Sequence, residues 1–235
     1  MPTPPRCFAL VPCAGVGARA GVGGPKQYAS LRGQAVVAHT LAALAAVPRL
    51  QATLVVLAPD DTVFEGQVPG FAGEHGWIAR CGGATRADTV TAGLQALRER
   101  GVADTDWVLV HDAARCLLQP AWVDRLIDAC LRDAVGGLLA LPLADTLKQA
   151  DHADHVAATL DRTAKWLAQT PQMFRLGLLQ RALAFAAQAG TAVTDESSAV
   201  EALDLAPRLV PGDIENFKLT WPTDFALAAR LLETR

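Results

Sequence analysis

The chain has 235 residues, of which 51% are hydrophobic and 19% are charged, and its net charge at pH 7 is −3. This length is within reach of one α/β domain, so we expect a single domain over residues 1–235. The weak charge gives the chain no global attraction to nucleic acid or to a membrane surface, and we expect neither as a partner.

Short apolar runs alternate with helical patterns along the chain. In chain order, the patterns predict a strand at Cys7–Val11, a helix at Val36–Val47, a strand at Leu54–Ala58, a helix at Thr85–Arg100, a strand at Trp107–Val110, a helix at Pro120–Arg132, a strand at Gly137–Leu141, and helices at Arg175–Gln188, Asp195–Leu203 and Pro222–Leu232. This alternation indicates an α/β fold with a single Rossmann-like, doubly wound, mainly parallel sheet. Ligands bind beyond the carboxyl ends of the strands in such sheets, so the chemistry is expected in the loops that follow strands.

The stretch Ala144–Thr163 breaks the alternation, because it is polar, rich in aspartate and without a helical period. It is either an extended arm that reaches out from the domain or a long loop.

Cysteine usage and the start of the chain bear on its compartment. The number of cysteines is odd and no C-x-x-C pair occurs, which argues against a disulfide framework and a zinc site. Residues 1–6 are proline-rich and lack the apolar segment of a secretory signal, and no apolar run approaches membrane-spanning length. We therefore expect a cytoplasmic protein with reduced cysteines.

A glycine-rich loop follows the first predicted strand. Gly15, Gly17 and Ala20 match the dinucleotide-binding pattern G-x-G-x-x-[GA]. That pattern requires a helix to begin at once, which the glycines after Ala20 and Pro25 prevent. An NAD-dependent dehydrogenase is therefore a remote alternative.

The same loop also contains two cations, Arg19 and Lys26. Glycines let backbone N–H groups approach phosphate oxygens, arginine can bind those oxygens bidentately, and lysine adds a compact charge. The loop alone is either a phosphate cradle or a solvated surface loop.

Further motifs follow this loop and cover nearly the whole chain. They are Pro12-x-Ala14-Gly15-x-Gly17-x-Arg19, Pro25-Lys26-Gln27-Tyr28, Gly82-Gly83-x-x-Arg86-Ala87-Asp88-Thr89-Val90, His111-Asp112-Ala113-Ala114-Arg115, Pro142-x-x-Asp145-Thr146, Asp161-Arg162, Gln169-Thr170-Pro171-Gln172, Thr194-Asp195-Glu196-Ser197-Ser198-Ala199 and Asn216-Phe217-Lys218-Leu219-Thr220. In this order they closely resemble the 2-C-methyl-D-erythritol 4-phosphate cytidylyltransferase family.

The resemblance implies transfer of CMP from CTP to 2-C-methyl-D-erythritol 4-phosphate, which gives 4-diphosphocytidyl-2-C-methyl-D-erythritol and pyrophosphate in non-mevalonate isoprenoid biosynthesis. The attacking phosphate oxygen is already an anion, so catalysis has to align two anions and stabilise charge at the α-phosphorus. That requires cations and magnesium rather than a general base. A ribitol 5-phosphate cytidylyltransferase is the alternative, against which Ala114 and Arg162 argue. A non-catalytic nucleotide-binding regulator is a further alternative, against which the retained cations argue.

The resemblance also assigns roles to single residues. The expected catalytic residues are Arg19, Lys26, Arg162 and Lys218. The expected nucleotide-binding residues are Ala14, Gly15, Gly82, Gly83, Thr89 and Ala113. The expected acceptor-binding residues are Asp112, Thr146, Arg162, Thr194, Glu215 and Lys218, and Asp112 is also the expected magnesium ligand.

Several of these residues have a structural alternative. Thr85 and Asp88 have the spacing of a capping box, so we expect them to cap a helix. Thr194 is expected to bind the acceptor phosphate, to cap the helix near Asp195, or both. We interpret His111 as structural, because the chemistry has no proton transfer for it.

In the family, the arginine and the Asp-Thr pair, here Arg162 and Asp145-Thr146, belong to an arm that reaches into the partner subunit. Residues 144–163 fit that arm, which implies a homodimer with composite active sites. The chain departs from the family pattern at Cys13, Ala84, Cys116 and Glu215. Because the sequence ends at Arg235, we expect none of the fused cyclase domain that some relatives have.

Overall fold

The computed structural model describes residues 5–15 and 24–234. A central sheet of seven strands has the spatial order β11-β7-β10-β6-β1-β4-β5. The bounds of these strands are β1 Cys7–Pro12, β4 Leu50–Val56, β5 Gly76–Ala79, β6 Trp107–Val110, β7 Gly136–Pro142, β10 Trp166–Arg175 and β11 Arg208–Pro211. Strand β10 runs antiparallel to both of its neighbours, and the other pairings in this sheet are parallel. The predicted α/β fold with a mainly parallel sheet is confirmed.

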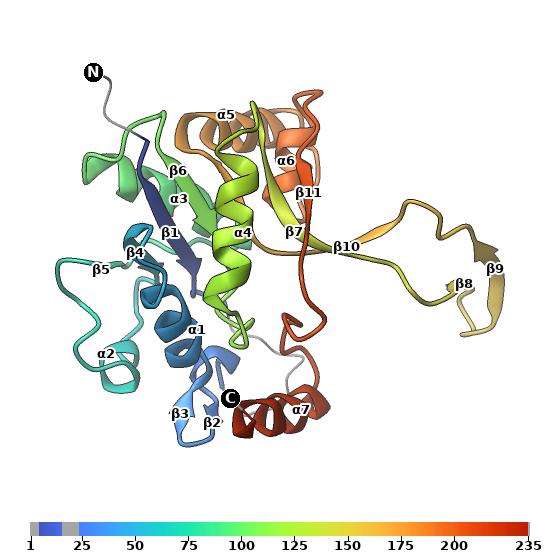
Figure 1. Cartoon of the computed structure of the whole chain (residues 1–235), viewed down its shortest axis with the longest axis horizontal. Coiled ribbons are helices and arrows are strands. Elements are labelled where there is room, and N and C mark those ends of the chain that lie inside the picture. The colour runs from blue at the N-terminus through green and yellow to red at the C-terminus, as the bar shows by residue number, and fades with distance from the viewer. Residues whose placement is uncertain (1–4, 16–23, 235) are drawn as a thin grey trace.

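Helices cover both faces of this sheet (Figure 1). The bounds of the helices are α1 Val36–Ala45, α2 Phe64–Gln67, α3 Arg86–Glu99, α4 Pro120–Cys130, α5 Leu176–Gln188, α6 Glu196–Glu201 and α7 Pro222–Glu233, with a 3₁₀ turn at Lys26–Tyr28. None of the helices in the described ranges has the length and apolar character that a membrane span requires.

Strand β1 shows why the central strands are continuous apolar runs. Cys7, Ala9 and Val11 belong to one core cluster, whereas Phe8 and Leu10 belong to another. Successive side chains of a strand point to opposite faces of a sheet, so a strand that is covered on both faces has to be apolar at every position.

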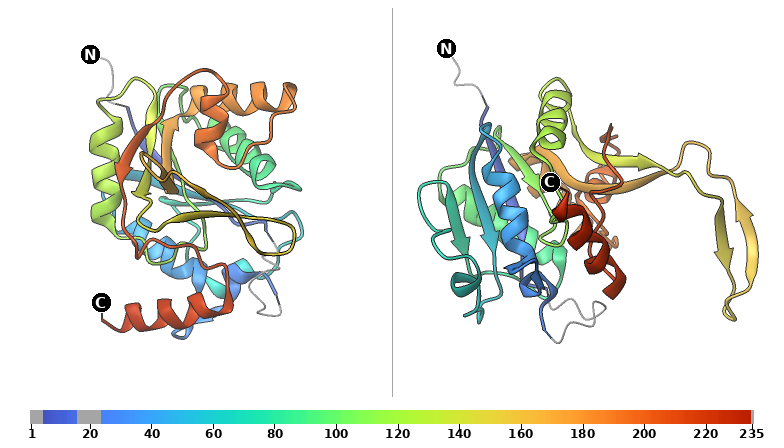
Figure 2. Two further views of the ribbon diagram at one scale, coloured as in Figure 1. Left: turned by 90° about the vertical axis from the view of Figure 1, so that its right-hand side faces the viewer. Right: turned by 60° about the horizontal axis from the view of Figure 1, so that its bottom comes forward.

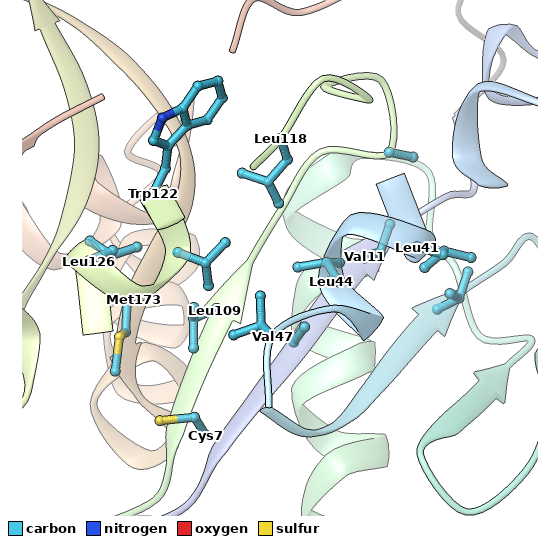
Figure 3. Packing of buried hydrophobic residues seen from close by; sticks show 14 of the residues in the cluster. Cys7, Val11, Leu41, Leu44, Val47, Leu109, Leu118, Trp122, Leu126 and Met173 are labelled. Atoms are coloured by element: carbon cyan, nitrogen blue, oxygen red, sulfur yellow. The ribbon is translucent and has the colours of Figure 1, made fainter. Parts of the chain in front are cut away.

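Helices α1 and α4 bury the first of these clusters. Leu41 and Leu44 of α1 lie over the sheet on the side of Val11, and Trp122 and Leu126 of α4 lie on the side of Leu109 and Met173 (Figure 3). Helices α3, α5 and α6 cover the other face, where leucines of α3 and α5 pack on even-numbered residues of β1 and β6. The two layers of helices hold the carboxyl ends of β1, β4 and β6 in a fixed arrangement.

Helix α3 begins with the predicted capping box. The Thr85 hydroxyl accepts from the Asp88 N–H at 3.1 Å, and the Asp88 carboxylate accepts from the Thr85 N–H at 3.0 Å. Gly93 lets the helix approach the sheet closely, because a Cβ there would lie 2.7 Å from Val56 and 2.8 Å from Leu10. The cap and the close approach fix the first turn of α3 at the edge of the sheet.

Helix α7 joins a third cluster on the other side of the loop that follows β6. Ala228 of α7 packs with Val36, Leu117 and Leu219. A short hairpin of β2 (Ser30–Leu31) and β3 (Gln34–Ala35) lies beside this helix. The last helix is therefore packed against residues that follow the glycine-rich loop.

Strand β10 was not predicted from the sequence, although it lies near the centre of the sheet. Pro171 argues against a central strand, because proline cannot donate to the hydrogen-bond ladder. In the structure, the pairing of β10 with β7 shifts register between Ala168 and Gln172, so Pro171 falls in the irregular segment. The sequence prediction also lacked β5 and β11.

The polar stretch that breaks the sequence pattern forms an arm. Strands β8 (Leu147–Ala150) and β9 (Val156–Leu160) pair as an antiparallel hairpin. The hairpin projects away from the sheet at the end of β7 and the start of β10 (Figures 1 and 2). Val156 is 64% exposed and Leu160 is 39% exposed.

Candidate active site

A cleft of about 300 Å³ lies at the carboxyl ends of β1 and β6, where a doubly wound sheet places its ligands. Its walls come from the loop after β1, the start of α3, the loop after β6 and the segment before α7. Nine residues of this lining matter to the chemistry below: Ala14, Gly15, Lys26, Gly83, Arg86, Thr89, Asp112, Ala113 and Lys218. Eight of these, all except Arg86, were expected site residues.

The described part of the glycine-rich loop is tied to both ends of the chain. The Gln27 side chain donates to the carbonyl groups of Cys13, at 3.1 Å, and Gly15, at 2.9 Å. The Lys26 ammonium donates to the carbonyl of Leu219 at 2.8 Å. Lys26 therefore faces the cleft beside the segment that carries Lys218. Arg19, the other expected cation of this loop, lies outside the described residues, as do Gly17 and Ala20.

Asp112 follows β6 and is surrounded by cations. Its Oδ1 accepts from Arg86 Nε at 2.9 Å, and its Oδ2 lies 2.8 Å from the Lys218 ammonium. The Arg115 guanidinium adds a third positive charge, 3.7 Å from Oδ2. Burial raises the pKa of Asp112, but Arg86, Lys218 and Arg115 lower it more, so the net pKa lies far below its usual range. The carboxylate is therefore ionised and holds the cations in place.

Arg86 bridges Asp112 to a second carboxylate. Its two terminal nitrogens donate to the two oxygens of Glu196, at 2.6 and 3.1 Å. The Glu196 side chain is 2% exposed and lies in the first turn of α6. A planar guanidinium suits such a paired contact. This bridge links the nucleotide-side helix α3 to helix α6.

The loop after β6 rests on a buried polar network. The Thr170 hydroxyl accepts from the Asp112 N–H at 3.0 Å and contacts His111 Nδ1 at 3.0 Å, and His111 Nε2 lies 3.2 Å from the Arg115 carbonyl. Asn216 donates to the Thr170 carbonyl at 2.8 Å. Burial lowers the pKa of His111 to about 4, so the ring is neutral at pH 7. This geometry supports the structural interpretation of His111.

Three residues shape the pocket expected for the base. A Cβ on Gly82 would lie 2.7 Å from the Leu57 carbonyl and would also meet Ala14, so only glycine fits there. The Thr89 hydroxyl donates to the Thr85 carbonyl at 2.9 Å and accepts from the Gly83 N–H at 3.1 Å. Thr89 therefore fixes the backbone of Gly83, which lines the cleft.

Four expected acceptor-binding residues do not line the cleft of their own chain. Thr146 and Arg162 lie in the arm segment, which projects away from the sheet (Figure 2). Glu215 lies in the segment before Lys218, where its N–H donates to Asp213 at 2.9 Å. Thr194 lies just before α6.

The expectation that Thr194 caps α6 is wrong. Asp195 is the N-cap, and its carboxylate accepts from the Ser198 N–H at 2.9 Å. Aspartate is as good an N-cap as threonine, and the helix begins one residue later than predicted. The Thr194 N–H donates instead to the Ser198 hydroxyl at 3.1 Å.

Sequence reasoning assigned no role to Arg86, Arg115 or Glu196, although all three lie inside quoted motifs. For Arg86 a signal was available. A positive charge in the first turn of a helix opposes the helix dipole, so an arginine there needs a reason other than helix stability. The partners of Arg115 and Glu196 are distant in sequence and could not be inferred from spacing.

The described residues do not fit a magnesium site made by the protein. No group of three or more His, Cys, Asp or Glu side chains that could hold a metal occurs among them. Both oxygens of Asp112 contact cations, Oδ1 that of Arg86 and Oδ2 that of Lys218, so the protein itself balances the charge of this carboxylate.

Comparison with known proteins gives one consistent answer. A model of the 2-C-methyl-D-erythritol 4-phosphate cytidylyltransferase family matches residues 7–234. The bifunctional enzyme IspD/IspF of Albidiferax ferrireducens is 60% identical over 99% of this chain and 54% of its own length, so the chain spans about half of that relative. The 2-C-methyl-D-erythritol 4-phosphate cytidylyltransferase of Laribacter hongkongensis is 54% identical, covering 97% of this chain and 96% of its own.

A solved structure agrees with these sequence matches. The crystal structure of a 4-diphosphocytidyl-2C-methyl-D-erythritol synthase superposes with a TM-score of 0.85 at 41% identity, and the match covers 97% of this chain and 98% of the other. The chain belongs to the 2-C-methyl-D-erythritol 4-phosphate cytidylyltransferase family and is therefore a nucleotidyltransferase.

Proposed function

We propose that this chain transfers CMP from CTP to 2-C-methyl-D-erythritol 4-phosphate in the cleft beyond β1 and β6, and releases pyrophosphate. The observation that supports this most is the meeting of Lys26 and Lys218 in one cleft, although they are far apart in the sequence. The two lysines supply positive charge where two phosphate groups would approach, and Arg86 and Arg115 hold the neighbouring Asp112 carboxylate.

The proposed chemistry uses charge and alignment rather than proton transfer. Lys26, together with Arg19, stabilises the charge on the α-phosphate and the leaving pyrophosphate. Lys218 holds the acceptor phosphate for attack, and Asp112 orients Lys218 and contacts an acceptor hydroxyl. The neutral, buried His111 supports the loop that carries Asp112. The nucleotide contacts are assigned to Ala14, Gly15 and the Gly82-Gly83 turn.

We propose that magnesium binds together with CTP. Magnesium is usually bound by a few carboxylates together with substrate phosphates, and it keeps several waters. Because residues 5–15 and 24–234 offer no cage of side chains for it, we assign its ligands mainly to triphosphate oxygens.

The arm is proposed to complete the site of a second copy of this chain. Thr146 and Arg162 lie in the arm segment, away from the cleft of their own chain, and apolar side chains of the hairpin are exposed. A homodimer would place Arg162 against the acceptor phosphate of its partner.

We also place the protein in the cytoplasm, where thiols are kept reduced, because its cysteines are free. Burial raises the pKa of Cys7 to about 11 and that of Cys13 to about 12, so these thiols are protonated at pH 7.

The test is pyrophosphate release by purified protein with CTP and magnesium. We expect release when 2-C-methyl-D-erythritol 4-phosphate is present and none when it is omitted. Ribitol 5-phosphate is the matched control acceptor. Release with ribitol 5-phosphate alone would overturn the proposed acceptor, and release with neither would overturn the proposed function.

A further inference from the structure

Arg86 is the one side chain of the cleft that joins two carboxylates on different elements, among the contacts that the structure describes. Its Nε contacts Asp112 at 2.9 Å, while its two terminal nitrogens contact Glu196 at 2.6 and 3.1 Å. Asp112 follows β6, Arg86 begins α3 and Glu196 begins α6. Three elements are therefore fixed to one another by a single guanidinium.

The burial of these groups explains why the two carboxylates depend on Arg86. The side chains of Glu196 and Asp112 are 2% and 9% exposed, whereas that of Arg86 is 29% exposed. A buried charge needs a close partner with good geometry. A lysine could neutralise one carboxylate, but its compact ammonium cannot make the forked contact to Glu196 and also reach Asp112.

The contact of Arg86 with Asp112 determines which oxygen of the Asp112 carboxylate faces Lys218. Arg86 occupies Oδ1, and Oδ2 faces the Lys218 ammonium at 2.8 Å. Rotation of the carboxylate would lengthen one of these contacts. The position of the Lys218 ammonium therefore depends on Arg86 through Asp112.

We propose that Arg86 is a positioning residue for the acceptor half of the reaction, acting through Asp112, and that Glu196 holds Arg86 in the required orientation. This inference rests on the proposed function and deepens it. Because Glu196 lies two residues after Thr194, the bridge also ties the segment that carries Thr194 to the first turn of α3. Helix stability does not explain Arg86, since Thr85 and Asp88 already cap α3 and a cation there opposes the helix dipole.

The test is a double-mutant cycle on the kinetics of pyrophosphate release. Arg86→Lys keeps the charge but removes the fork, and we expect kcat/KM for the acceptor to fall about 10- to 100-fold, as for loss of hydrogen bonds to a charged group. The KM for CTP is expected to change by less than about threefold, since the nucleotide contacts are elsewhere. In an Asp112→Asn background, Arg86→Lys is expected to lower kcat/KM for the acceptor by less than about threefold, because the residue through which Arg86 acts is already altered.

Glu196→Gln provides a second route to the same answer. It leaves Arg86 and Asp112 in place, so a milder loss with the same selectivity for the acceptor is expected. Arg98→Lys is the matched control, because Arg98 lies in the same helix, pairs with Asp104 and does not line the cleft. It is expected to match the wild-type kinetics, and thermal unfolding of each variant identifies any that fails to fold. If Arg86→Lys fails to fold, Glu196→Gln takes its place in the cycle.

The outcomes separate the inference from the function on which it rests. If the wild-type protein releases pyrophosphate but the losses from Arg86→Lys and Asp112→Asn multiply, Arg86 acts independently of Asp112 and the inference is wrong. If kcat/KM for CTP and for the acceptor fall equally in single-turnover assays, a general structural role replaces the positioning role. If the wild-type protein is inactive with the acceptor, the proposed function fails, and the inference fails with it.

Discussion

The cleft end of the sheet and the arm are stabilised in opposite ways. At the cleft, charged side chains from distant parts of the sequence hold one another, and both carboxylates of the network are less than a tenth exposed. On the arm, two short strands pair with each other, while Val156 and Leu160 face solvent. An isolated two-stranded hairpin is at best marginally stable in water.

This difference shows which contacts each part of the molecule makes within one chain. The described part of the cleft takes Lys26, Lys218, two buried carboxylates and their supporting network from the same chain. The arm has exposed apolar side chains and two expected acceptor-binding residues, Thr146 and Arg162, neither of which lines the cleft at β1 and β6. The arm is therefore the part whose role depends on a second surface.

The largest expected effect tests whether the cleft cations act on the chemistry rather than on the fold. Lys26→Ala is expected to lower the rate of pyrophosphate release about 10²- to 10³-fold, because it removes an electrostatic contact to the developing charge. The free energy of unfolding, measured with urea, is expected to change by less than about 1 kcal/mol. Arg132→Ala, which removes an exposed cation after α4, is the control. Full activity of Lys26→Ala would contradict the assigned mechanism.

A second prediction concerns the buried network under the cleft. The pKa of His111 is about 4 in the folded chain and about 6.5 when unfolded, so the unfolded state binds a proton that the folded state does not as the pH falls between these values. Stability is therefore complete above pH 6.5 and falls by on the order of 3 kcal/mol on approaching pH 4, about 10²-fold in the folding equilibrium.

This dependence is measured by urea unfolding between pH 7 and pH 4. His111→Gln is expected to be less stable at pH 7 but to lose less stability as the pH falls. The control is His152→Gln on the exposed arm, which is expected to keep the wild-type pH dependence. An identical pH dependence in wild type and His111→Gln would show that His111 is not the group involved.

The smallest expected effect tests the arm. Val156→Asp puts a charge on its exposed apolar face and is expected to convert a dimer to a monomer, seen as a halved mass in light scattering. Activity is expected to fall roughly tenfold, since the contact of Arg162 to the partner's acceptor would be lost. Phe185→Asp makes the same kind of change on α5, where Phe185 is 46% exposed, and is expected to alter neither mass nor activity. A wild-type monomer with full activity would contradict the composite site.

Elements of the fold could be predicted from the sequence where a local pattern of apolar residues was enough to determine the structure. The apolar runs of β1, β6 and β7 were recognised because strands covered on both faces have to be apolar throughout. Strand β10 was missed because Pro171 and its polar neighbours disguise a strand whose ladder is interrupted at that point. The arm was recognised as a break in pattern, but its hairpin was not, since β8 and β9 have no buried face to make them apolar.

The site was predicted to the extent that motifs named residues in loops after strands. Lys26, Asp112 and Lys218 were singled out, and they line the same cleft. The bridge from Arg86 to Glu196 joins residues 110 positions apart, and no spacing rule connects such a pair. The dinucleotide pattern at Gly15 was a false lead, because the family match supports a cytidylyltransferase and not a dehydrogenase.

The contact of Lys26 with the Leu219 carbonyl has a consequence for the order of events during synthesis. The two groups are 193 residues apart, and Lys218 follows β11, the last strand of the central sheet. A ribosome adds about 5–20 residues per second, so roughly ten seconds or more pass between the synthesis of Lys26 and that of Leu219, whose carbonyl it contacts. A nascent chain can therefore assemble most of its sheet while it is still unable to bring Lys26 and Lys218 together.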